Sequence, residues 1–162
     1  MELPGLEEAQ AILARWTAAV EDGRAGRTLD WELRVAVKME AWAKRLLAAV
    51  EAGGATFDLR LQVIRVNDIV IAGMNVETFF ETGLGSRERS PLPDTFVLGY
   101  TNGSMAYLPR AEDQPEGGWR LDERYALPDW IPQFYPGQVT ALHPDSEQRA
   151  LEGTLALINT LS

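Results

Sequence analysis

The spacing of apolar residues changes after the first third of the chain, from the helical period of about 3.6 residues to the strand period of about 2. Before the change, apolar residues recur every third or fourth position in two stripes, which predicts two amphipathic helices. The stripes are Leu6, Ala9, Leu13, Trp16 and Val20, then Val35, Met39, Trp42, Leu46 and Val50. Gly23 follows the first stripe as a C-terminal cap would, and Gly53-Gly54 ends the second. Two such helices are expected to pack as an antiparallel pair or to lie together on a sheet.

After the change, apolar and polar residues alternate, which predicts strands. The alternation gives a first strand over Phe57–Val66 with one buried face. Asn67-Asp68 is a tight-turn signal, and Ile69–Ala72 reads as the returning, more fully buried strand. A short helix is predicted over Thr78–Leu84, and Thr95–Tyr100 is predicted to form a third strand of the same sheet.

The last part of the chain is predicted to be a long loop followed by one helix. Prolines and glycines interrupt every candidate element over residues 109–144. The resulting order predicts an α/β or α+β fold, with a mixed sheet flanked by two N-terminal helices and a C-terminal helix. The helices bearing Trp16, Trp42 and Leu155 are expected to pack on the sheet. A length of 162 residues fits a single domain over residues 1–162, or one large piece of a bigger domain.

Composition argues against several classes of function. The chain has 15 Lys and Arg against 24 Asp and Glu, a net charge of −9, which repels nucleic-acid backbones and anionic membranes. No apolar run approaches the roughly 18 residues of a transmembrane helix. The N-terminus is acidic where a signal peptide would be basic. We therefore expect no nucleic-acid partner, no transmembrane segment and no signal peptide, and a soluble chain that is cytoplasmic by default.

Few catalytic constellations can be built from these residue types. The chain has no cysteine, so disulfides, thiol catalysis and Cys-ligated zinc are excluded. It has one histidine, so it cannot supply a multi-histidine metal site, and it lacks the Gly-rich phosphate loop. A Ser-His-Asp set would require His143, which stands at a predicted helix entrance. We interpret His143 as a surface or capping residue and assign no catalytic residue to the chain.

Two stretches could nevertheless carry chemistry. In Val70–Glu77, a buried strand delivers an acidic residue just past its C-terminal end, where ligands collect in open α/β sheets. The alternative is that Glu77 is an exposed residue in the first turn of a helix. In Leu98–Pro109, a strand leads into the Asn102-Gly103 turn, and the stretch contains two tyrosines. Those tyrosines are either half-buried packing residues or, next to a cation, anionic oxygen ligands.

Taken together and in order, these motifs resemble the end of the catalytic region of the neutral/alkaline (non-lysosomal) ceramidase family. That family has a strand leading into Pro-Gly-Glu, a helix ending in Arg-Ser-Pro, a Gly-x-x-Asn-Gly strand end with Tyr-x-Pro after it, and a Gly-Gly-Tyr-Glu loop. The matching residues are Asn67–Gly73, Glu77–Phe79, Ser90-Pro91, Gly99–Gly103, Tyr107–Pro109 and Gly117–Trp119. The family's Pro-Gly is Asn75-Val76 here, and its Tyr-Glu is Trp119-Arg120.

The resemblance implies a zinc-dependent amidohydrolase. In the family, two histidines, a glutamate and a tyrosine hold the zinc, and the last two map onto Glu77 and Tyr107. The histidines and the serine nucleophile belong to the upstream half, which nothing in this chain matches, so an upstream chain or domain would be the partner. The family name implies a sphingolipid amide as substrate. The alternative interpretation is a non-catalytic α/β binding or interaction module.

Overall fold

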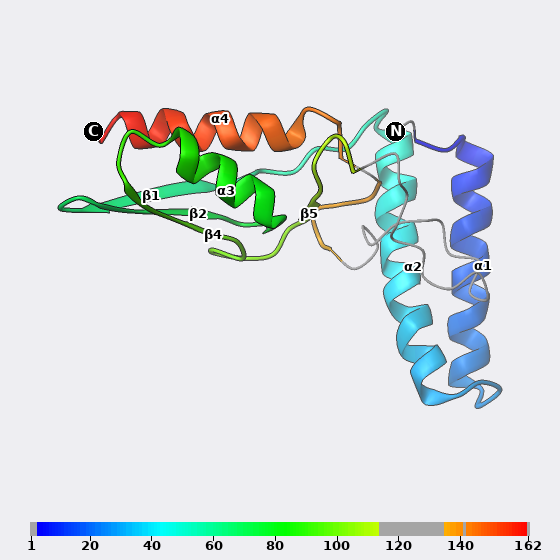
Figure 1. Cartoon of the computed structure of the whole chain (residues 1–162). Coiled ribbons are helices and arrows are strands. Elements are labelled where there is room, and N and C mark those ends of the chain that lie inside the picture. Colours follow the sequence, from blue (N-terminus) through cyan, green and yellow to red (C-terminus); the bar gives the residue numbers. More distant parts are fainter. Residues whose placement is uncertain (1–2, 114–134, 141, 162) are drawn as a thin grey trace. The chain divides into compact units, whose positions relative to one another are not determined.

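A computed structural model describes residues 3–113, 135–140 and 142–161, and it divides the chain into two compact units. The first comprises residues 1–56 with 132–141, and the second comprises residues 57–131 with 142–162. The described part contains four helices and a mixed three-stranded sheet, with two helices before the sheet and one helix after it, which is an α+β arrangement (Figure 1). The single-domain organisation over residues 1–162 stays a prediction.

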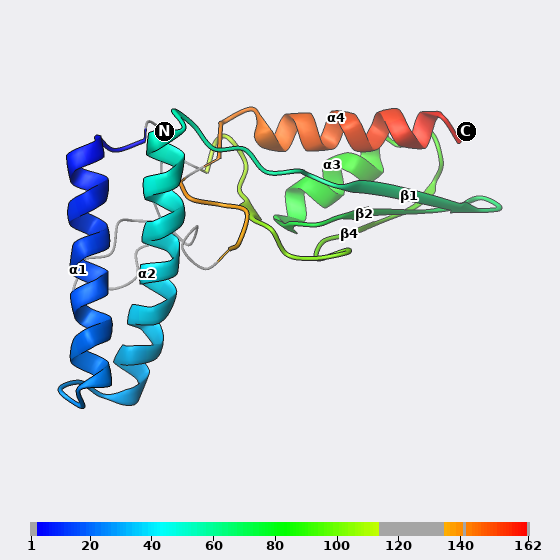
Figure 2. The same ribbon diagram turned by 180° about the vertical axis from the view of Figure 1, so that it is seen from behind.

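The first unit is a helical hairpin. Helix α1 spans Leu6–Arg24 and helix α2 spans Asp30–Glu51, and the two run antiparallel (Figures 1 and 2). Their predicted apolar stripes face each other, with Trp16 and Val20 buried on α1 and Trp42 among the buried residues of α2. At the end of α2, Gly53 adopts φ +72°, a left-handed conformation that glycine accepts without strain, as the sequence predicted.

Gly23 does not cap α1, so that prediction is wrong. The helix continues to Arg24, and the left-handed residue of the connection is Gly26, at φ +71°. A Cβ at position 23 would lie 2.7 Å from Leu33 Cδ1 on α2. The glycine is therefore required by close helix packing rather than by the end of the helix.

A returning segment is fastened to this hairpin by side-chain hydrogen bonds. The indole Nε1 of Trp42 donates to the Val139 carbonyl at 2.9 Å. Arg45 donates to the Tyr135 carbonyl at 3.2 Å, from a guanidinium whose pKa is lowered by burial. Residues 135–140 form no helix or strand. They use α2 side chains as hydrogen-bond donors instead, which places the indole of Trp42 in a fixed orientation.

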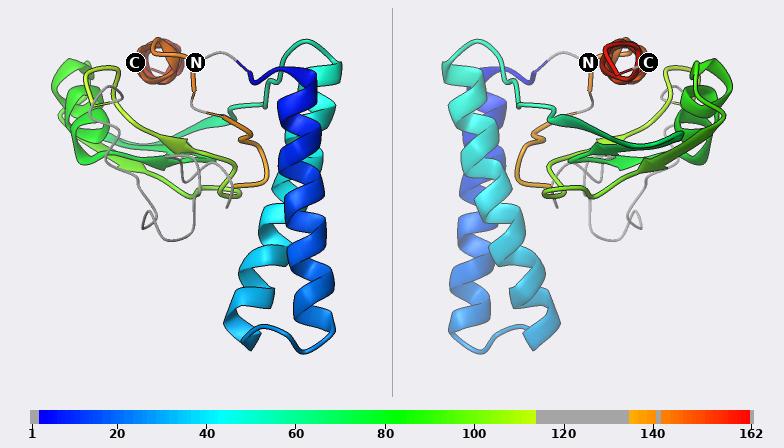
Figure 3. Two further views of the ribbon diagram at one scale, coloured as in Figure 1. Left: turned by 90° about the vertical axis from the view of Figure 1, so that its right-hand side faces the viewer. Right: turned by 90° about the vertical axis from the view of Figure 1, so that its left-hand side faces the viewer.

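The second unit is built on a sheet of three strands in the order β1-β2-β4. Strand β1 (Leu61–Val66) pairs antiparallel with β2 (Ile69–Met74), and β2 pairs parallel with β4 (Asp94–Leu98). Helix α4 (Ser146–Asn159) packs on β1 and β2, and helix α3 (Phe80–Arg89) packs on β4 and on α4 (Figure 3). The core under α4 consists of Val70, Ala72, Leu151, Leu155 and Ile158. The predicted three-stranded sheet is thus confirmed. Of the helices expected to pack on it, the one bearing Leu155 does so, whereas those bearing Trp16 and Trp42 pack on each other.

The ends of the elements differ from the sequence prediction where the backbone finds other partners. Strand β1 begins at Leu61, not Phe57, because the backbone before it bonds to the Asn75 side chain, described below. Strand β4 ends at Leu98, because Tyr100 adopts φ +57° and turns the chain. The segment Glu77–Thr78 forms β3, which pairs parallel with β5 (Tyr107–Leu108), so α3 begins only at Phe80.

Most of the predicted loop over residues 109–144 lies outside the described residues, as does the Gly117–Trp119 match. None of the helices in the described part has the length and hydropathy that a membrane span requires.

Trp42 should be a stability determinant of the first unit. Its side chain is 4% exposed, and truncating a buried aromatic residue costs about 3–5 kcal/mol. We therefore expect Trp42→Ala to lower the free energy of unfolding by that amount, measured by denaturant titration of the helical circular dichroism. The matched control is Val37→Ala, also on α2 but 43% exposed, which should change stability by about 0.5 kcal/mol or less. Equal effects of the two substitutions would contradict this assignment.

Candidate functional site

The site is formed where the end of β2 meets a loop comprising residues 99–106, which we call the site loop. Four backbone hydrogen bonds join them: Thr101 N–H to Met74 O (2.9 Å), Tyr100 N–H to Val76 O (3.0 Å), Met105 N–H to Asn75 O (2.8 Å) and Glu77 N–H to Ala106 O (2.9 Å). Every residue from 74 to 77 therefore makes a backbone bond to the loop. The two segments form one hydrogen-bonded unit, although about 25 residues separate them in sequence.

The site loop turns through three left-handed residues. Tyr100 has φ +57°, Asn102 has φ +61° and Gly103 has φ +131°. The Asn102 amide also donates to Gln62 Oε1 at 2.9 Å, which ties the turn to β1. The loop passes so close to β2 that a Cβ at Gly73 would lie 2.6 Å from the Thr101 side chain. A glycine at position 73 is thus a condition for this approach.

Asn75 links the junction, by which we mean residues 74–77 and the site loop bonded to them, to the backbone that precedes β1. The residue is 2% exposed, and its side-chain Oδ1 accepts the Arg60 N–H at 2.8 Å while its Nδ2 donates to the Asp58 carbonyl at 3.1 Å. Its own N–H donates to the Arg60 carbonyl at 3.3 Å. In the resembled motif a proline stands here, and a proline could donate neither bond. An asparagine at this position therefore makes hydrogen bonds that a proline could not make.

Glu77 and Tyr107 lie side by side. They are register partners in the parallel β3-β5 pair, and directly paired residues point to the same face of a sheet. The alternative position for Glu77, in the first turn of a helix, is wrong, because α3 begins three residues later. The ring of Phe79 meets the Tyr107 ring edge-on, with centroids 5.5 Å apart and planes at 78°. This contact fixes the phenol beside the carboxylate.

Both phenols near Glu77 are held in their protonated form. Burial raises the pKa of Tyr107 above its usual value of about 10, and the negative charge of Glu77 raises it further. The pKa of Tyr100 is raised mainly by a hydrogen bond to the Glu77 side chain, with burial and the charge of Glu77 adding to it. The charge of Glu77 contributes to both shifts, since a tyrosinate beside a carboxylate places two negative charges together.

Sequence reasoning did not assign Tyr100 to the site. The alternation of residues 95–100 placed it at the end of a strand, whereas its left-handed backbone directs the hydroxyl to Glu77. A usable signal was present in the Gly99-Tyr100 pair just before the Asn102-Gly103 turn, because glycine and asparagine mark a change of chain direction. A Cβ at Gly99 would lie 3.1 Å from the Val76 carbonyl, so this glycine also permits the close approach.

His143 lies outside this cluster of oxygen atoms. It is exposed at the entrance to α4, where its Nδ1 accepts the Asp145 N–H at 3.2 Å and its carbonyl accepts the Ser146 N–H at 2.9 Å. These contacts match the surface or capping role expected from the sequence. In the part of the chain that the structure describes, no three His, Cys, Asp or Glu side chains are grouped to hold a metal ion. What the site offers is one carboxylate and two phenol oxygens.

No protein-family model, curated protein or solved structure matches the chain. The function is therefore inferred from the residues of the site and from their geometry.

Removing the charge of Glu77 should lower the pKa of Tyr100. The carboxylate disfavours the tyrosinate, so Glu77→Gln should move the Tyr100 titration down toward the ordinary value of about 10. The measurement is a pH titration of the assigned Tyr100 ring resonances by NMR. Glu88→Gln, an exposed change on α3, is the charge-matched control and should leave the titration where it was. An unchanged Tyr100 pKa in Glu77→Gln would contradict the described hydrogen bond.

Proposed function

We propose that this chain is the C-terminal part of a zinc-dependent amidohydrolase resembling neutral ceramidase. In this proposal Glu77 and Tyr107 are metal ligands, and an upstream chain or domain supplies the histidines and the serine nucleophile. The observation that supports it is the pairing of Glu77 with Tyr107 across the parallel β3-β5 ladder, 30 residues apart in sequence. The resemblance points to each of these residues separately, and their pairing in one register supports assigning both to one site.

The donor atoms of the site are consistent with half of a zinc site. Zinc accepts carboxylate oxygens, and a catalytic zinc usually has three protein ligands and one open position. The raised pKa of Tyr107 has a direct consequence for this idea, because a phenol becomes a good ligand only as it loses its proton. Glu77 opposes that loss, and a divalent cation between the two groups would favour it. This chain alone is therefore expected to hold zinc weakly.

Bound zinc would supply Lewis-acid polarisation of an amide carbonyl and activation of water. This chain's own residues would contribute position and charge. Glu77 provides the fixed negative charge, and its backbone N–H is held by the Ala106 carbonyl at 2.9 Å. The hydroxyl of Tyr100 donates a hydrogen bond to Glu77 and so orients the carboxylate. Phe79 packs against Tyr107 and keeps its phenol in place.

Zinc titration of the purified chain, followed by an amidase assay, tests the proposal. We expect weak binding by calorimetry, further weakened in Glu77→Gln and Tyr107→Phe, and no hydrolysis of N-acylsphingosine or simple N-acyl amides. The control is Tyr135→Phe, a phenol of the first unit, which should leave the zinc isotherm unchanged. Zinc binding that is indifferent to both Glu77 and Tyr107 would contradict their assignment. Turnover by the chain alone would contradict the need for an upstream partner.

Tyr100 should matter once the ligand set is complete. Outer partners of metal ligands typically change metal affinity by about 10–100-fold. After addition of a His- and Ser-bearing upstream chain, Tyr100→Phe should weaken zinc binding by that factor and leave the fold intact, since Tyr100 is 57% exposed. Competition with a zinc chelator measures the affinity. Assembly that yields a stable complex with neither zinc nor activity would favour the alternative function, a non-catalytic binding module.

A further inference from the structure

Strand β4 is an edge strand whose outer side has no pairing partner in the described part of the chain. It pairs with β2 on one side only, and the sheet order places nothing beyond it. Proteins usually protect such an edge with charged side chains, prolines or a bulge. In β4 the only charged residue is Asp94, at the start of the strand after Pro93, and the remaining segment Thr95–Leu98 has neither charge nor proline. Thr95, Phe96 and Val97 have high strand propensity. Among the described residues, this edge of the sheet is therefore open for pairing with another strand.

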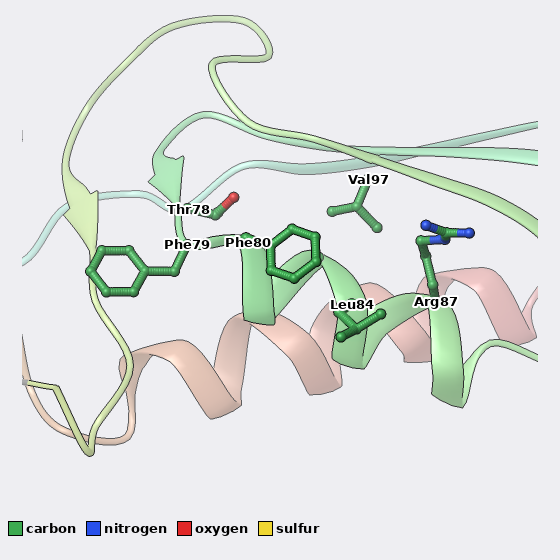
Figure 4. A pocket seen from close by; sticks show the side chains of 7 residues that line it. Thr78, Phe79, Phe80, Leu84, Arg87 and Val97 are labelled. Carbon is green, nitrogen blue, oxygen red and sulfur yellow. The ribbon is translucent and has the colours of Figure 1, made fainter.

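Apolar side chains flank this edge on both faces of the sheet. On one face Phe96 and Leu98 are 56% and 47% exposed. On the other face a groove of about 220 Å³ lies between β4 and α3 (Figure 4). Val97 forms its floor on the strand side, and Phe80 and Leu84 come from the helix, with Phe80 75% exposed. Consecutive residues of an added strand point to opposite faces, so both apolar surfaces would be covered by alternate side chains.

One cation lies at the end of the groove. Arg87 lines it together with Val97, and in Figure 4 its guanidinium lies at the end away from Phe79. Arg87 is exposed and makes no ion pair with a described carboxylate. A carboxylate on the occupant would therefore find a charged hydrogen-bond donor that no carboxylate in the described ranges engages.

We propose that the free edge of β4 docks one extended strand of a partner polypeptide, with alternating apolar residues and an acidic residue that reaches Arg87. The identity of this partner as the upstream hydrolase chain rests on the proposed function, whereas the binding mode does not. Docking there would extend the sheet that carries the site loop, since β4 leads directly into Gly99 and Tyr100. An occupant of this edge would thus lie along the strand that leads to Tyr100, the hydrogen-bond partner of Glu77.

Two features favour a different chain over a second copy. Each copy has a net charge of −9, which opposes self-association. Helix α3 and β4 are joined by residues 90–93 and run in opposite directions, so Arg87 lies near the start of β4 (Figure 4). Symmetric antiparallel pairing of two β4 strands would bring Asp94 of the second copy to Leu98, at the far end from Arg87. The only acidic residue of the strand would then miss the cation.

The test uses a phage-displayed library of linear peptides of about six to ten residues, matching common strand lengths, against the intact zinc-free chain. We expect enriched peptides to alternate apolar and variable residues and to carry Asp or Glu at one end. Leu98→Lys should abolish binding of a selected peptide, measured by fluorescence polarisation. The matched control is Ile64→Lys, equally exposed on the opposite edge strand β1, which should retain binding. Peptide saturation should slow amide exchange in β4.

Charge reversal gives the sharpest outcome. Arg87→Glu should lower the affinity for the acidic peptide at least about tenfold, the effect of losing one charged hydrogen bond. A peptide with Lys at the acidic position should bind the Arg87→Glu variant with restored affinity. Absence of enriched peptides, indifference to both Leu98→Lys and Arg87→Glu, or exchange protection away from β4 would overturn the proposal. A dimer in sedimentation that Leu98→Lys dissociates would assign the edge to a second copy and also overturn it. None of these readouts involves zinc or hydrolysis, so the proposed function can fail independently.

Discussion

The second unit depends on the hydrogen bonds that converge on residues 74–77. Asn75 alone engages the backbone of residues 58–60 through its side chain and N–H, and the site loop through its carbonyl. Asn75 is 2% exposed, so losing a hydrogen bond to its side-chain amide would leave a buried polar group without a partner, at a cost of about 1–3 kcal/mol. The start of β1, the end of β2 and the lead into β5 are therefore placed by one side chain and its neighbouring peptide groups.

This junction also determines the electrostatics of the site. Because Glu77 N–H bonds to Ala106 O, Tyr107 is brought into register with the glutamate. Because Tyr100 N–H bonds to Val76 O, the second phenol is also brought to the Glu77 carboxylate. Burial raises the pKa of Tyr107, the hydrogen bond to Glu77 raises the pKa of Tyr100, and the charge of Glu77 adds to both shifts. In the proposed function this cluster would supply part of a zinc site, and a second polypeptide would supply the imidazoles that complete it.

Periodicity predicted the elements well where one face of a segment is apolar throughout. The stripe through Trp16 and Val20 and the alternation before Val66 both gave the correct element type, because the burial of a continuous face decides the local conformation. The ends were less predictable. Gly23 looked like a cap and is instead a packing contact with Leu33, and Thr78 looked helical and lies in β3. In each case a residue outside the local segment decides the outcome: Leu33 packs against Gly23, and Leu108 pairs with Thr78. No local pattern can reveal such a partner.

The family resemblance selected Glu77 and Tyr107 as a pair worth testing, and the sequence by itself determined two amphipathic N-terminal helices and a three-stranded sheet within an α/β or α+β fold. Those features depend on burial and turn chemistry within short segments. Only the tertiary structure decided that Tyr100 joins Glu77, that Asn75 holds the junction and that the β4 edge lies open beside a groove. These depend on hydrogen bonds and contacts between residues far apart in the chain, whose partners are defined only once the strands have found their register.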